Sequence, residues 1–316
     1  MNSIISWVGG KKALRELIYA RFPENYDRYI EVFGGGGWVL FGKTPDKFEV
    51  YNDFNNNLTN MFSVLREQPL AFIQKLGYLP ENGRYIFSLY KDIISKQRVE
   101  DKYIEDEIQK VKVYFTELQA EEIMEIMKKE RIVNQDVRLA VAFLKLIRYS
   151  YGSGCKTFGC RPYDLRKAFS TVWDVSDRLA NTIVENKDFE ALICQYDRPN
   201  AFFYCDPPYY ETEGMYEVMF TKEDHTRLRD CLAGVQGKFL LSYNDCDFIR
   251  DLYKDFYIES CTRVNNMALR YDSGAEFPEL LISNYDASKG SRMRKQLGLF
   301  DCEEDTPGEE EENENN

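Results

Sequence analysis

The chain has 316 residues, of which 44% are hydrophobic and 30% are charged. Such a chain can bury one large core, or a core with an inserted second unit, so intrinsic disorder is excluded for most of it. It has no apolar run long enough for a membrane span and no export signal at its N-terminus. We therefore expect a cytoplasmic protein without membrane contact, in which the eight cysteines are reduced thiols.

The cysteines and the histidine do not indicate a metal site. Only Cys155 and Cys160 lie close together, whereas a zinc site usually takes a second close pair of Cys or His ligands. The single histidine, His225, lies in a charged helical segment with no nucleophile elbow beside it. We expect no bound metal and a structural role for His225.

The formal net charge of −12 argues at first against nucleic acid as a partner. Nine of the acidic residues, however, lie in the segment 301–316, which has no Lys or Arg, so residues 1–300 carry a net charge of only −3. The composition of this acidic tail is that of a disordered segment. A solubilising role and competition with DNA for a basic segment at 289–295 both remain open for it.

Six basic side chains between positions 145 and 167 occur with a single acid, Asp164, and predict a local basic face. Such a face is either ordinary solvated surface or a contact surface for DNA. Five of the six are the candidate DNA contacts: Arg148, Lys156, Arg161, Arg166 and Lys167.

The predicted elements begin with a short apolar strand at 29–33, a glycine run, and a second strand at 48–51. From about 55 to 150 the apolar residues repeat at helical spacing with almost no Gly or Pro, which predicts a helical block. Strand-like segments then return, with a helical pattern at 222–232 among them. An α/β sheet interrupted by a helical insertion explains this order better than two independent domains. The later strands are predicted at 201–205, 238–244, 256–261 and 279–285.

The glycines and aromatic residues at 149–163 predict a hairpin or an exposed loop at the end of the helical block. Tyr149, Tyr151 and Phe158 lie in this segment, among its basic residues. They could stack on bases, or they could pack the loop onto the helices. The sequence does not choose between these interpretations.

The segment 31–39 places four glycines directly after the first strand. Glycine lets the backbone approach a ligand closely there, although a tight strand-to-helix turn would need the same residues. The spacing completes neither the dinucleotide-binding fingerprint nor the phosphate-binding P-loop. Asp53 follows the second strand, where an acid commonly holds ribose hydroxyls, or it caps the helix that begins near Asn55. Together these features favour an adenosine-containing ligand.

The most specific signal is Asp206-Pro207-Pro208-Tyr209, which directly follows a strand-like segment. Two prolines fix the backbone and remove two amide donors, so their carbonyls become a rigid row of acceptors. A carboxylate and a proline carbonyl can accept both hydrogens of an exocyclic amino group, and the tyrosine offers a stacking face for a flipped base. The alternative, without a functional role, is a strand that ends in a proline turn.

These segments together closely resemble the Dam-like family of S-adenosylmethionine-dependent DNA adenine-N6 methyltransferases. The resemblance spans residues 6–285 and rests on the joint order of its motifs. It implies a Rossmann-like methyltransferase sheet with an inserted helical target-recognition domain. The motifs are Trp7-Val8-Gly9-Gly10-Lys11, Phe33 with the glycines at 34–37, Asp53, and Asp206-Pro207-Pro208-Tyr209. The implied domains are 1–60 (cofactor binding), 61–165 (target recognition, with the basic loop), 166–300 (active site) and the disordered acidic tail at 301–316.

The resemblance also implies a role for each matching residue, and no metal. Asp206 and the carbonyl of Pro207 would accept hydrogen bonds from the amino group of adenine, and Tyr209 would stack on the extruded base. The implied catalytic residues are Asp206, Pro207, Pro208 and Tyr209. The implied residues for S-adenosylmethionine are Trp7, Lys11, Phe33, Gly35, Gly37, Asp53 and Asp206.

The sequence thus predicts a site-specific enzyme that methylates the exocyclic amino group of adenine in double-stranded DNA, by base flipping and direct in-line transfer. A non-catalytic DNA-binding protein with the same fold remains an alternative, as does an amino-methyltransferase for another substrate. A cognate restriction endonuclease could be a further partner. The sequence indicates no oligomeric state.

Overall fold

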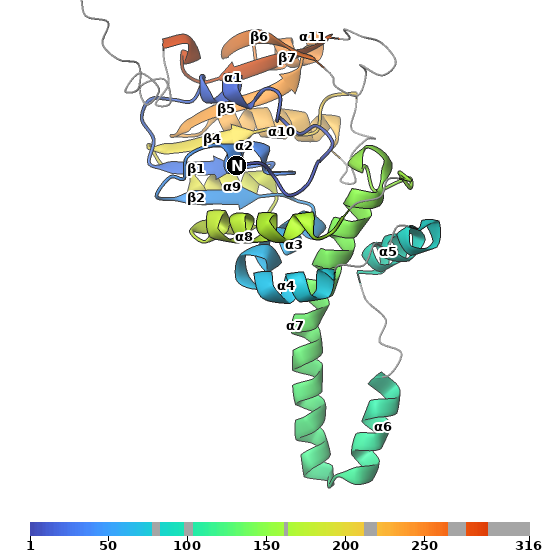
Figure 1. Ribbon diagram of the computed structural model, residues 1–316. Coiled ribbons are helices and arrows are strands. Elements are labelled where there is room, and N and C mark those ends of the chain that lie inside the picture. The colour runs from blue at the N-terminus through green and yellow to red at the C-terminus, as the bar shows by residue number, and fades with distance from the viewer. Residues whose placement is uncertain (78–82, 98–103, 161–163, 212–219, 265–275, 290–316) are drawn as a thin grey trace, which may run out of the picture.

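The computed structural model describes residues 1–77, 83–97, 104–160, 164–211, 220–264 and 276–289. Within these residues the chain forms one sheet of seven strands in the order β3-β2-β1-β4-β5-β7-β6 (Figure 1). Strands β1 to β5 pair in parallel, and β7 runs antiparallel to both of its neighbours. The strands are β1 (Arg28–Glu31), β2 (Glu49–Asn52), β3 (Thr182–Glu185), β4 (Ala201–Cys205), β5 (Lys238–Asn244), β6 (Tyr257–Val264) and β7 (Glu276–Ser283).

The central strands are apolar on both faces, as a parallel sheet covered by helices requires. Successive side chains alternate between the two faces of a strand. Phe202 of β4 therefore packs into one hydrophobic cluster, while its neighbour Phe203 packs into the other. The pairs Tyr29 with Ile30 and Leu240 with Leu241 divide in the same way, so two cores lie on opposite sides of the sheet.

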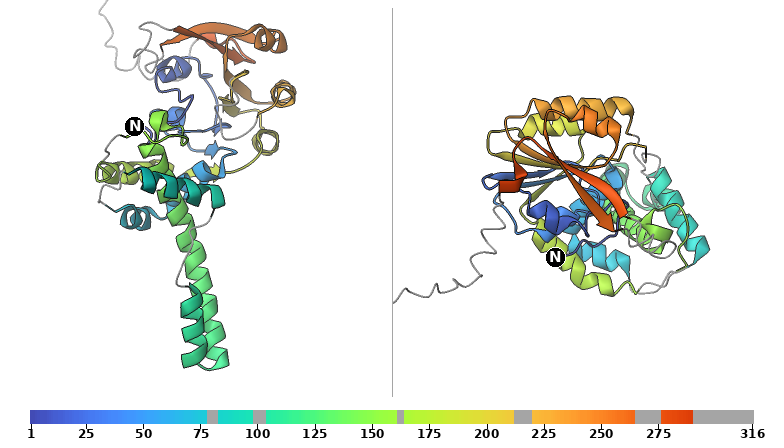
Figure 2. Two further views of the ribbon diagram at one scale, coloured as in Figure 1. Left: turned by 90° about the vertical axis from the view of Figure 1, so that its right-hand side faces the viewer. Right: turned by 90° about the horizontal axis from the view of Figure 1, so that it is seen from above.

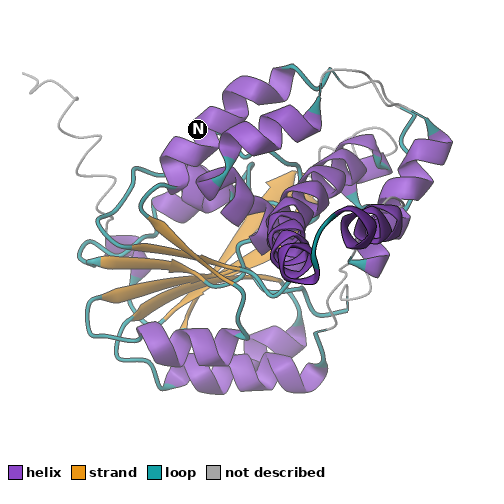
Figure 3. Cartoon of the chain, turned by 90° about the horizontal axis from the view of Figure 1, so that it is seen from below, coloured by secondary structure: helices purple, strands orange, loops and turns teal. Residues whose placement is uncertain are grey.

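Helices cover both faces (Figure 3). One face packs against α9, α10 and α11, and the other against α1, α2, α3 and α8. The helices are α1 (Arg15–Tyr19), α2 (Trp38–Gly42), α3 (Asn56–Glu67), α4 (Pro69–Leu76), α5 (Arg84–Lys96), α6 (Ile104–Tyr114), α7 (Glu117–Tyr149), α8 (Lys167–Leu179), α9 (Phe189–Tyr196), α10 (Lys222–Ala233) and α11 (Asp247–Leu252), with short 3-10 turns η1 (Tyr151–Ser153) and η4 (Ala287–Lys289).

The helices α3 to α8 all lie between β2 and β3 in the sequence. The C-terminal half of α7 is buried against α3, α4 and α5, while α6 and the first half of α7 extend away from the sheet (Figure 2). Residues of this helical block share one hydrophobic cluster with the sheet, Phe143 of α7 and Phe202 of β4 among them. The described residues therefore show helices inserted in the sequence but no separate helical core, and the domain boundaries at 60, 165 and 300 stay predictions.

Most of the predicted elements are confirmed. Strands β4 and β5 lie where the sequence places them, and α10 extends the predicted helix by one residue. The structure adds β3 and α9, which the sequence analysis did not predict. Strand β3 has four residues at the edge of the sheet, of which only Thr182 is buried, so its apolar pattern is too short to be noticed. The acidic tail at 301–316, Arg161 and nearly all of the basic segment at 289–295 lie outside the described residues.

The predicted hairpin at the end of the helical block is present. Ser150 and Phe158 form an isolated antiparallel bridge, and the amide of Tyr151 donates to the carbonyl of Thr157. None of the helices in the described ranges combines the length and apolar character needed to cross a bilayer.

A buried ionic network joins the start of β2 to α8. Two nitrogens of Arg178 contact the carboxylate of Glu49 at 2.5 and 3.0 Å, and Lys43 forms an ion pair with the same carboxylate. Burial alone would raise the pKa of Glu49, but the hydrogen bonds of Arg178 and the charge of Lys43 lower it below its ordinary value. The carboxylate is therefore ionised, and it fixes α8 on the sheet.

We expect Arg178→Met to lower the free energy of unfolding by about 3 kcal/mol, because it removes one of the two cationic partners of a buried carboxylate. Urea denaturation measures this loss. The control is Lys254→Met, which removes a pair between side chains that are 66% and 81% exposed, and such a pair is worth at most about 1 kcal/mol. A loss no larger than that of the control would contradict the structural role of the network.

Candidate functional site

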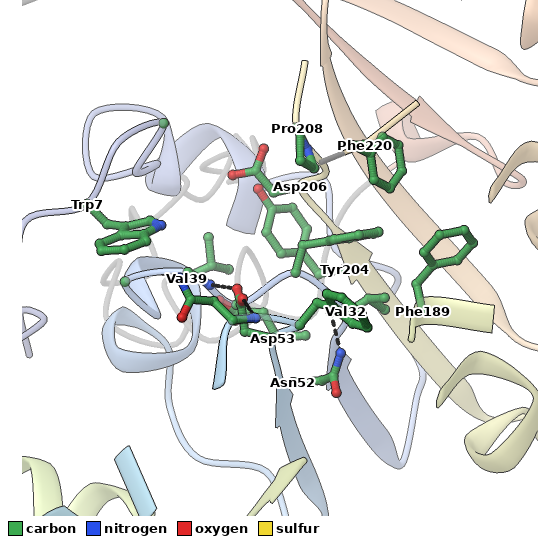
Figure 4. A pocket seen from close by; sticks show the side chains of 18 of the residues that line it. Trp7, Val32, Val39, Asn52, Asp53, Phe189, Tyr204, Asp206, Pro208 and Phe220 are labelled. Carbon is green, nitrogen blue, oxygen red and sulfur yellow. Dashed lines mark hydrogen bonds between the residues drawn. The ribbon is translucent and has the colours of Figure 1, made fainter. Parts of the chain in front are cut away.

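A cavity of about 320 Å³ opens at the carboxyl ends of β1, β2 and β4 (Figure 4). Strand β1 lies between β2 and β4, so the chain reverses its direction of travel across the sheet at this point. Open α/β sheets bind ligands at such a switch point, and small-molecule sites typically occupy about 300–1,000 Å³. The cavity wall includes Trp7, Lys11, Glu31, Phe33, Gly35, Asp53, Asp188, Phe189, Asp206, Pro208, Phe220 and Arg227.

The glycine loop between β1 and α2 brings bare backbone to the cavity. Gly35 and Gly37 have φ values of +49° and +68°, a left-handed conformation that other residues rarely adopt. Gly34 is required for a different reason, because a Cβ atom there would lie 2.2 Å from the ring of Tyr51. The hydroxyl of Tyr51 donates to the carbonyl of Gly35 at 2.7 Å, so the ring cannot move aside freely.

Asp53 ties the end of β2 to this loop. Its Oδ2 accepts from the amide of Gly35 at 2.8 Å, and its Oδ1 accepts from the amide of Asn55 at 2.7 Å. The cap of α3 is Asn55, whose side chain accepts from the amide of Asn57, so the interpretation of Asp53 as a helix cap is wrong. Burial raises the pKa of Asp53 to about 6, although the two amides favour the charged form.

Asp206, directly after β4, pairs with Lys11. Lys11 Nζ lies 2.7 Å from Asp206 Oδ1, and the hydroxyl of Ser242 donates to the same oxygen at 2.9 Å. Burial raises the pKa of Asp206, and the charge of Lys11 opposes that shift. Within the described residues both of these contacts reach Oδ1, so Oδ2 keeps acceptor capacity, and Asp206 lines the cavity.

Tyr209 lies deeper than its predicted stacking role suggests. It is 9% exposed, and its hydroxyl donates to Glu279 of β7 at 2.9 Å. Lys11 Nζ lies 4.6 Å from the centre of the Tyr209 ring. Of the predicted catalytic tetrapeptide, Asp206 and Pro208 are among the residues that line the cavity, whereas Pro207 and Tyr209 are not.

Three aromatic rings form one wall of the cavity. Phe33, predicted from the sequence, lies 5.7 Å from Phe189 and 5.9 Å from Phe220 between ring centres. Arg227 of α10 stacks on Phe189 at 4.3 Å and pairs with Asp188 at 2.7 Å. The sequence analysis missed Asp188, Phe189 and Arg227, because Asp188 caps a helix whose preceding strand it did not predict.

Glu31 was also missed as a site residue, although it begins the glycine motif. Its side chain is buried, and the hydroxyl of Tyr29 donates to it at 2.7 Å. Burial raises the pKa of Glu31 to about 8. Trp7 lies against the glycine loop, also lines the cavity, and lies 5.9 Å from Phe143 of α7 between ring centres.

The described residues among the predicted DNA contacts do not line the cavity. Arg148 donates to the backbone carbonyl of Ile4, and Arg166 pairs with its neighbour Asp164 at 2.8 Å. Lys156 and Lys167 are exposed, and Arg161 lies outside the described residues. Lys145 is buried, with its ammonium over the ring of Tyr90, so the prediction of a basic face is wrong for that residue.

The sequence left open whether the aromatic residues of the hairpin pack onto the helices or stack on bases, and the structure differs from residue to residue. Tyr149 is buried, and Phe158 packs against Phe87 of α5 at 5.7 Å between ring centres, which confirms the packing interpretation for both. Tyr151 is 58% exposed, so it can contact a partner.

The surroundings of the histidine and of the two neighbouring cysteines show no metal or catalytic site in the described residues. His225 is fully buried, and its Nδ1 lies 2.5 Å from the hydroxyl of Tyr243. Cys155 is buried, and Cys160 is exposed. In the part of the chain that the structure describes, no three His, Cys, Asp or Glu side chains gather as metal ligands would.

Comparison with known proteins places these features in one family. Residues 7–267 match the model of the D12 class of N6 adenine-specific DNA methyltransferases. The chain is 27% identical to the type II methyltransferase M1.LlaDCHI of Lactococcus lactis over 307 residues, which cover 90% of this chain and 96% of that protein. It is 24% identical to the type II methyltransferase M.MjaIII of Methanocaldococcus jannaschii, over 90% of this chain and 99% of that protein. A DNA adenine methylase of Vibrio cholerae is 32% identical over 29% of this chain and 32% of its own.

The family match covers most of the chain, so the chain belongs to the D12 class of N6 adenine-specific DNA methyltransferases. It is an adenine-specific DNA methyltransferase with a Rossmann-like sheet. Methyltransferases of this class take their methyl group from S-adenosylmethionine, and they act on DNA.

We expect Gly34→Ala to destabilise the protein by about 1–3 kcal/mol, because the added methyl group overlaps a ring that is held at its hydroxyl. Thermal and urea denaturation measure the loss. Gly83→Ala is the matched control, since the nearest side-chain atom would lie 3.9 Å from the new Cβ. Equal stability of the two variants would show that the loop can shift to accommodate the added methyl group.

Proposed function

We propose that the cavity holds S-adenosylmethionine, which supplies a methyl group already activated on a sulfonium. The glycine loop and Asp53 support this proposal, because bare backbone and a carboxylate suit a nucleoside. The carboxylate of Asp206 suits a cationic ligand, and the rings of Phe33 and Phe189 suit a planar base. Glu31, whose raised pKa of about 8 leaves it mostly protonated near neutral pH, would offer a hydrogen bond and not a charge. Trp7, Lys11 and Gly35 would complete the site, and Gly37, which is not among the lining residues, would keep the loop in its left-handed conformation.

The role of Asp206 is the centre of the proposed mechanism. Its Oδ2 and the carbonyl of Pro207 would accept the two hydrogens of the amino group of an extruded adenine, which frees the nitrogen lone pair for the methyl carbon. Pro208 keeps this backbone rigid. Lys11 and Ser242 hold the other oxygen of Asp206 and favour the charged carboxylate, against the burial that raises its pKa. For Tyr209 to stack on the base, DNA binding would have to expose its ring, which is 9% exposed and held between Glu279 and Lys11.

We expect Asp206→Ala and Asp206→Asn to lower the turnover of DNA methylation by on the order of a hundredfold or more, because both remove a carboxylate contact that strengthens in the transition state. Single-turnover transfer of labelled methyl to unmethylated DNA measures the rate. Thermal denaturation checks folding, since the alanine variant leaves Lys11 buried without its carboxylate. Near-normal turnover in the asparagine variant would show that the charge of Asp206 is not needed for methyl transfer.

The pKa of Asp53 predicts how cofactor affinity depends on pH. The raised pKa of about 6 means that the carboxylate gains a proton as the pH falls through that value. If one charged carboxylate holds the ribose hydroxyls, affinity for S-adenosylmethionine should be constant above this pH and fall by up to about tenfold per pH unit below it.

Calorimetry between pH 5 and pH 7 tests this expectation, over a range that brackets the pKa of about 6. Asp53→Asn keeps the shape of the side chain and cannot titrate. It should bind more weakly, by about 1.5–3 kcal/mol, with no change across the range. If the affinity of wild type and Asp53→Asn falls in the same way at low pH, the titrating group is not Asp53.

We further propose that α5 and the hairpin form the DNA-facing surface of the region 61–165. The two elements lie together, because Lys91 of α5 donates to the carbonyl of Lys156 and Arg84 stacks on Phe158. Their described residues, 83–97 and 150–160, carry four basic side chains and one acid. Tyr85 is 79% exposed on the same helix. This surface replaces the predicted face at 145–167 as the set of phosphate contacts.

We expect the pair Lys91→Ala and Lys156→Ala to flatten the salt dependence of DNA binding by about one or two units of logarithmic slope, since each phosphate contact releases counterions. Fluorescence anisotropy over a salt series measures the slope. The control pair, Lys47→Ala and Lys254→Ala, removes the same charge from exposed positions outside α5 and the hairpin. Equal slopes for both pairs would place the DNA elsewhere.

The names of the relatives suggest one further protein partner. Because the relatives from Lactococcus lactis and Methanocaldococcus jannaschii are named type II methyltransferases, we propose a cognate restriction endonuclease for this enzyme. A cytoplasmic location stays a prediction. A non-catalytic protein is disfavoured, because Asp206 is present and lines the cavity.

A further inference from the structure

The helices α6 and α7 form an arm that extends away from the sheet (Figures 1 and 2). We define the arm as residues 104–135, which end just before Val137, where α7 enters the core. At about 1.5 Å per residue, the arm part of α7 is on the order of 30 Å long. The two helices pack against each other.

Large apolar side chains lie exposed near the tip of the arm. Val113, Tyr114 and Leu118 are 74%, 78% and 71% exposed. Phe115 and Ile126 are exposed as well. Two helices share a single seam, along which Ala120 is buried, and they cannot bury a second apolar set without a partner. A cluster of exposed apolar side chains marks a protein contact site.

The charge of the arm excludes DNA as that partner. The arm has eight acidic and five basic residues, a net charge of −3, and its stretch 107–127 has five acidic and two basic residues. Phosphates would be repelled, whereas α5 and the hairpin already offer a basic surface. The charged residues of this stretch are Glu107, Lys110, Lys112, Glu117, Glu121, Glu122 and Glu125.

The distribution of these charges makes the arm complementary to itself. Lys110 and Lys112 lie near the end of α6, and four glutamates lie near the start of α7. If α6 of one copy packs antiparallel to α7 of its partner, the lysines meet the glutamates twice, as a two-fold axis requires. The exposed apolar side chains then enter the centre of a four-helix bundle, in which each helix is antiparallel to its neighbours.

We propose that the arm is a homodimerisation element whose occupant is the arm of a second copy of this chain. The methyltransferase cavity is not part of this contact, because none of the arm residues whose side chains the structure describes lines it. The proposal therefore stands apart from the proposed function, and methyl transfer gives an independent check that each variant is folded.

Sedimentation velocity of the full chain over a concentration series is the first test. The wild type should shift from monomer to dimer. Leu118→Glu should weaken the dimer by about tenfold or more, because it places a charge in the centre of the bundle. Leu70→Glu changes a residue that is 58% exposed on α4, outside the arm, and should leave the dimer intact. A wild type that stays monomeric throughout, or equal effects of the two variants, would overturn the proposal.

Charge reversal tests the pairing of α6 with the partner's α7. A chain with Lys110→Glu and Lys112→Glu should lose self-association, and so should a chain with Glu121→Lys and Glu125→Lys. An equimolar mixture of the two should form heterodimers, because reversed charges meet at one seam and native charges at the other. Ion pairs within one chain cannot produce this rescue. A mixture that stays monomeric, or an arm that binds a different basic protein and not its own copy, would contradict the proposal.

Discussion

Desolvation of three carboxylates is the constraint around which the cavity is built. Glu31, Asp53 and Asp206 stand at the carboxyl ends of three adjacent parallel strands, and burial raises the pKa of each. A buried charge is costly unless it is paired or hydrogen-bonded. The protein gives each carboxylate a different partner: a tyrosine hydroxyl, two backbone amides, and a lysine with a serine hydroxyl. These partners hold the surrounding loops in place.

Lys11 connects the two ends of the active-site segment. It pairs with Asp206, lies over the ring of Tyr209, and donates to the carbonyl of Gly9. One buried ammonium thus fixes the N-terminal segment, the proposed catalytic carboxylate and the tyrosine together. Glu279 of β7 holds Tyr209 from the other side, so the antiparallel end of the sheet also takes part in the site. This explains why residues from distant parts of the sequence must fold together before the cavity exists.

The sequence could predict the features that are local. Strands β4 and β5 are continuous apolar runs because both of their faces are buried, and such runs are visible without a structure. The glycine loop, Asp53 and the Asp206 tetrapeptide follow strands, so their place at one edge of the sheet could be inferred as well. The sequence could not show that Tyr209 is tied to Glu279, seventy residues away, or that Phe158 packs on Phe87. Those contacts depend on tertiary packing.

The dependence on tertiary packing also explains why the net charge of the chain does not predict whether it binds DNA. Between exposed charges, electrostatic interactions are screened over about 8 Å at physiological ionic strength, so distant surfaces act independently. The helical block separates its charges accordingly: α5 and the hairpin carry four basic residues against one acid, whereas residues 107–127 carry a net charge of −3. Lys145, which the sequence groups with the basic face, is buried against Tyr90 and adds nothing to the surface. An acidic protein can therefore present a basic surface to DNA, because the contact depends on the charges within a few ångströms of the phosphates and not on their sum over the chain.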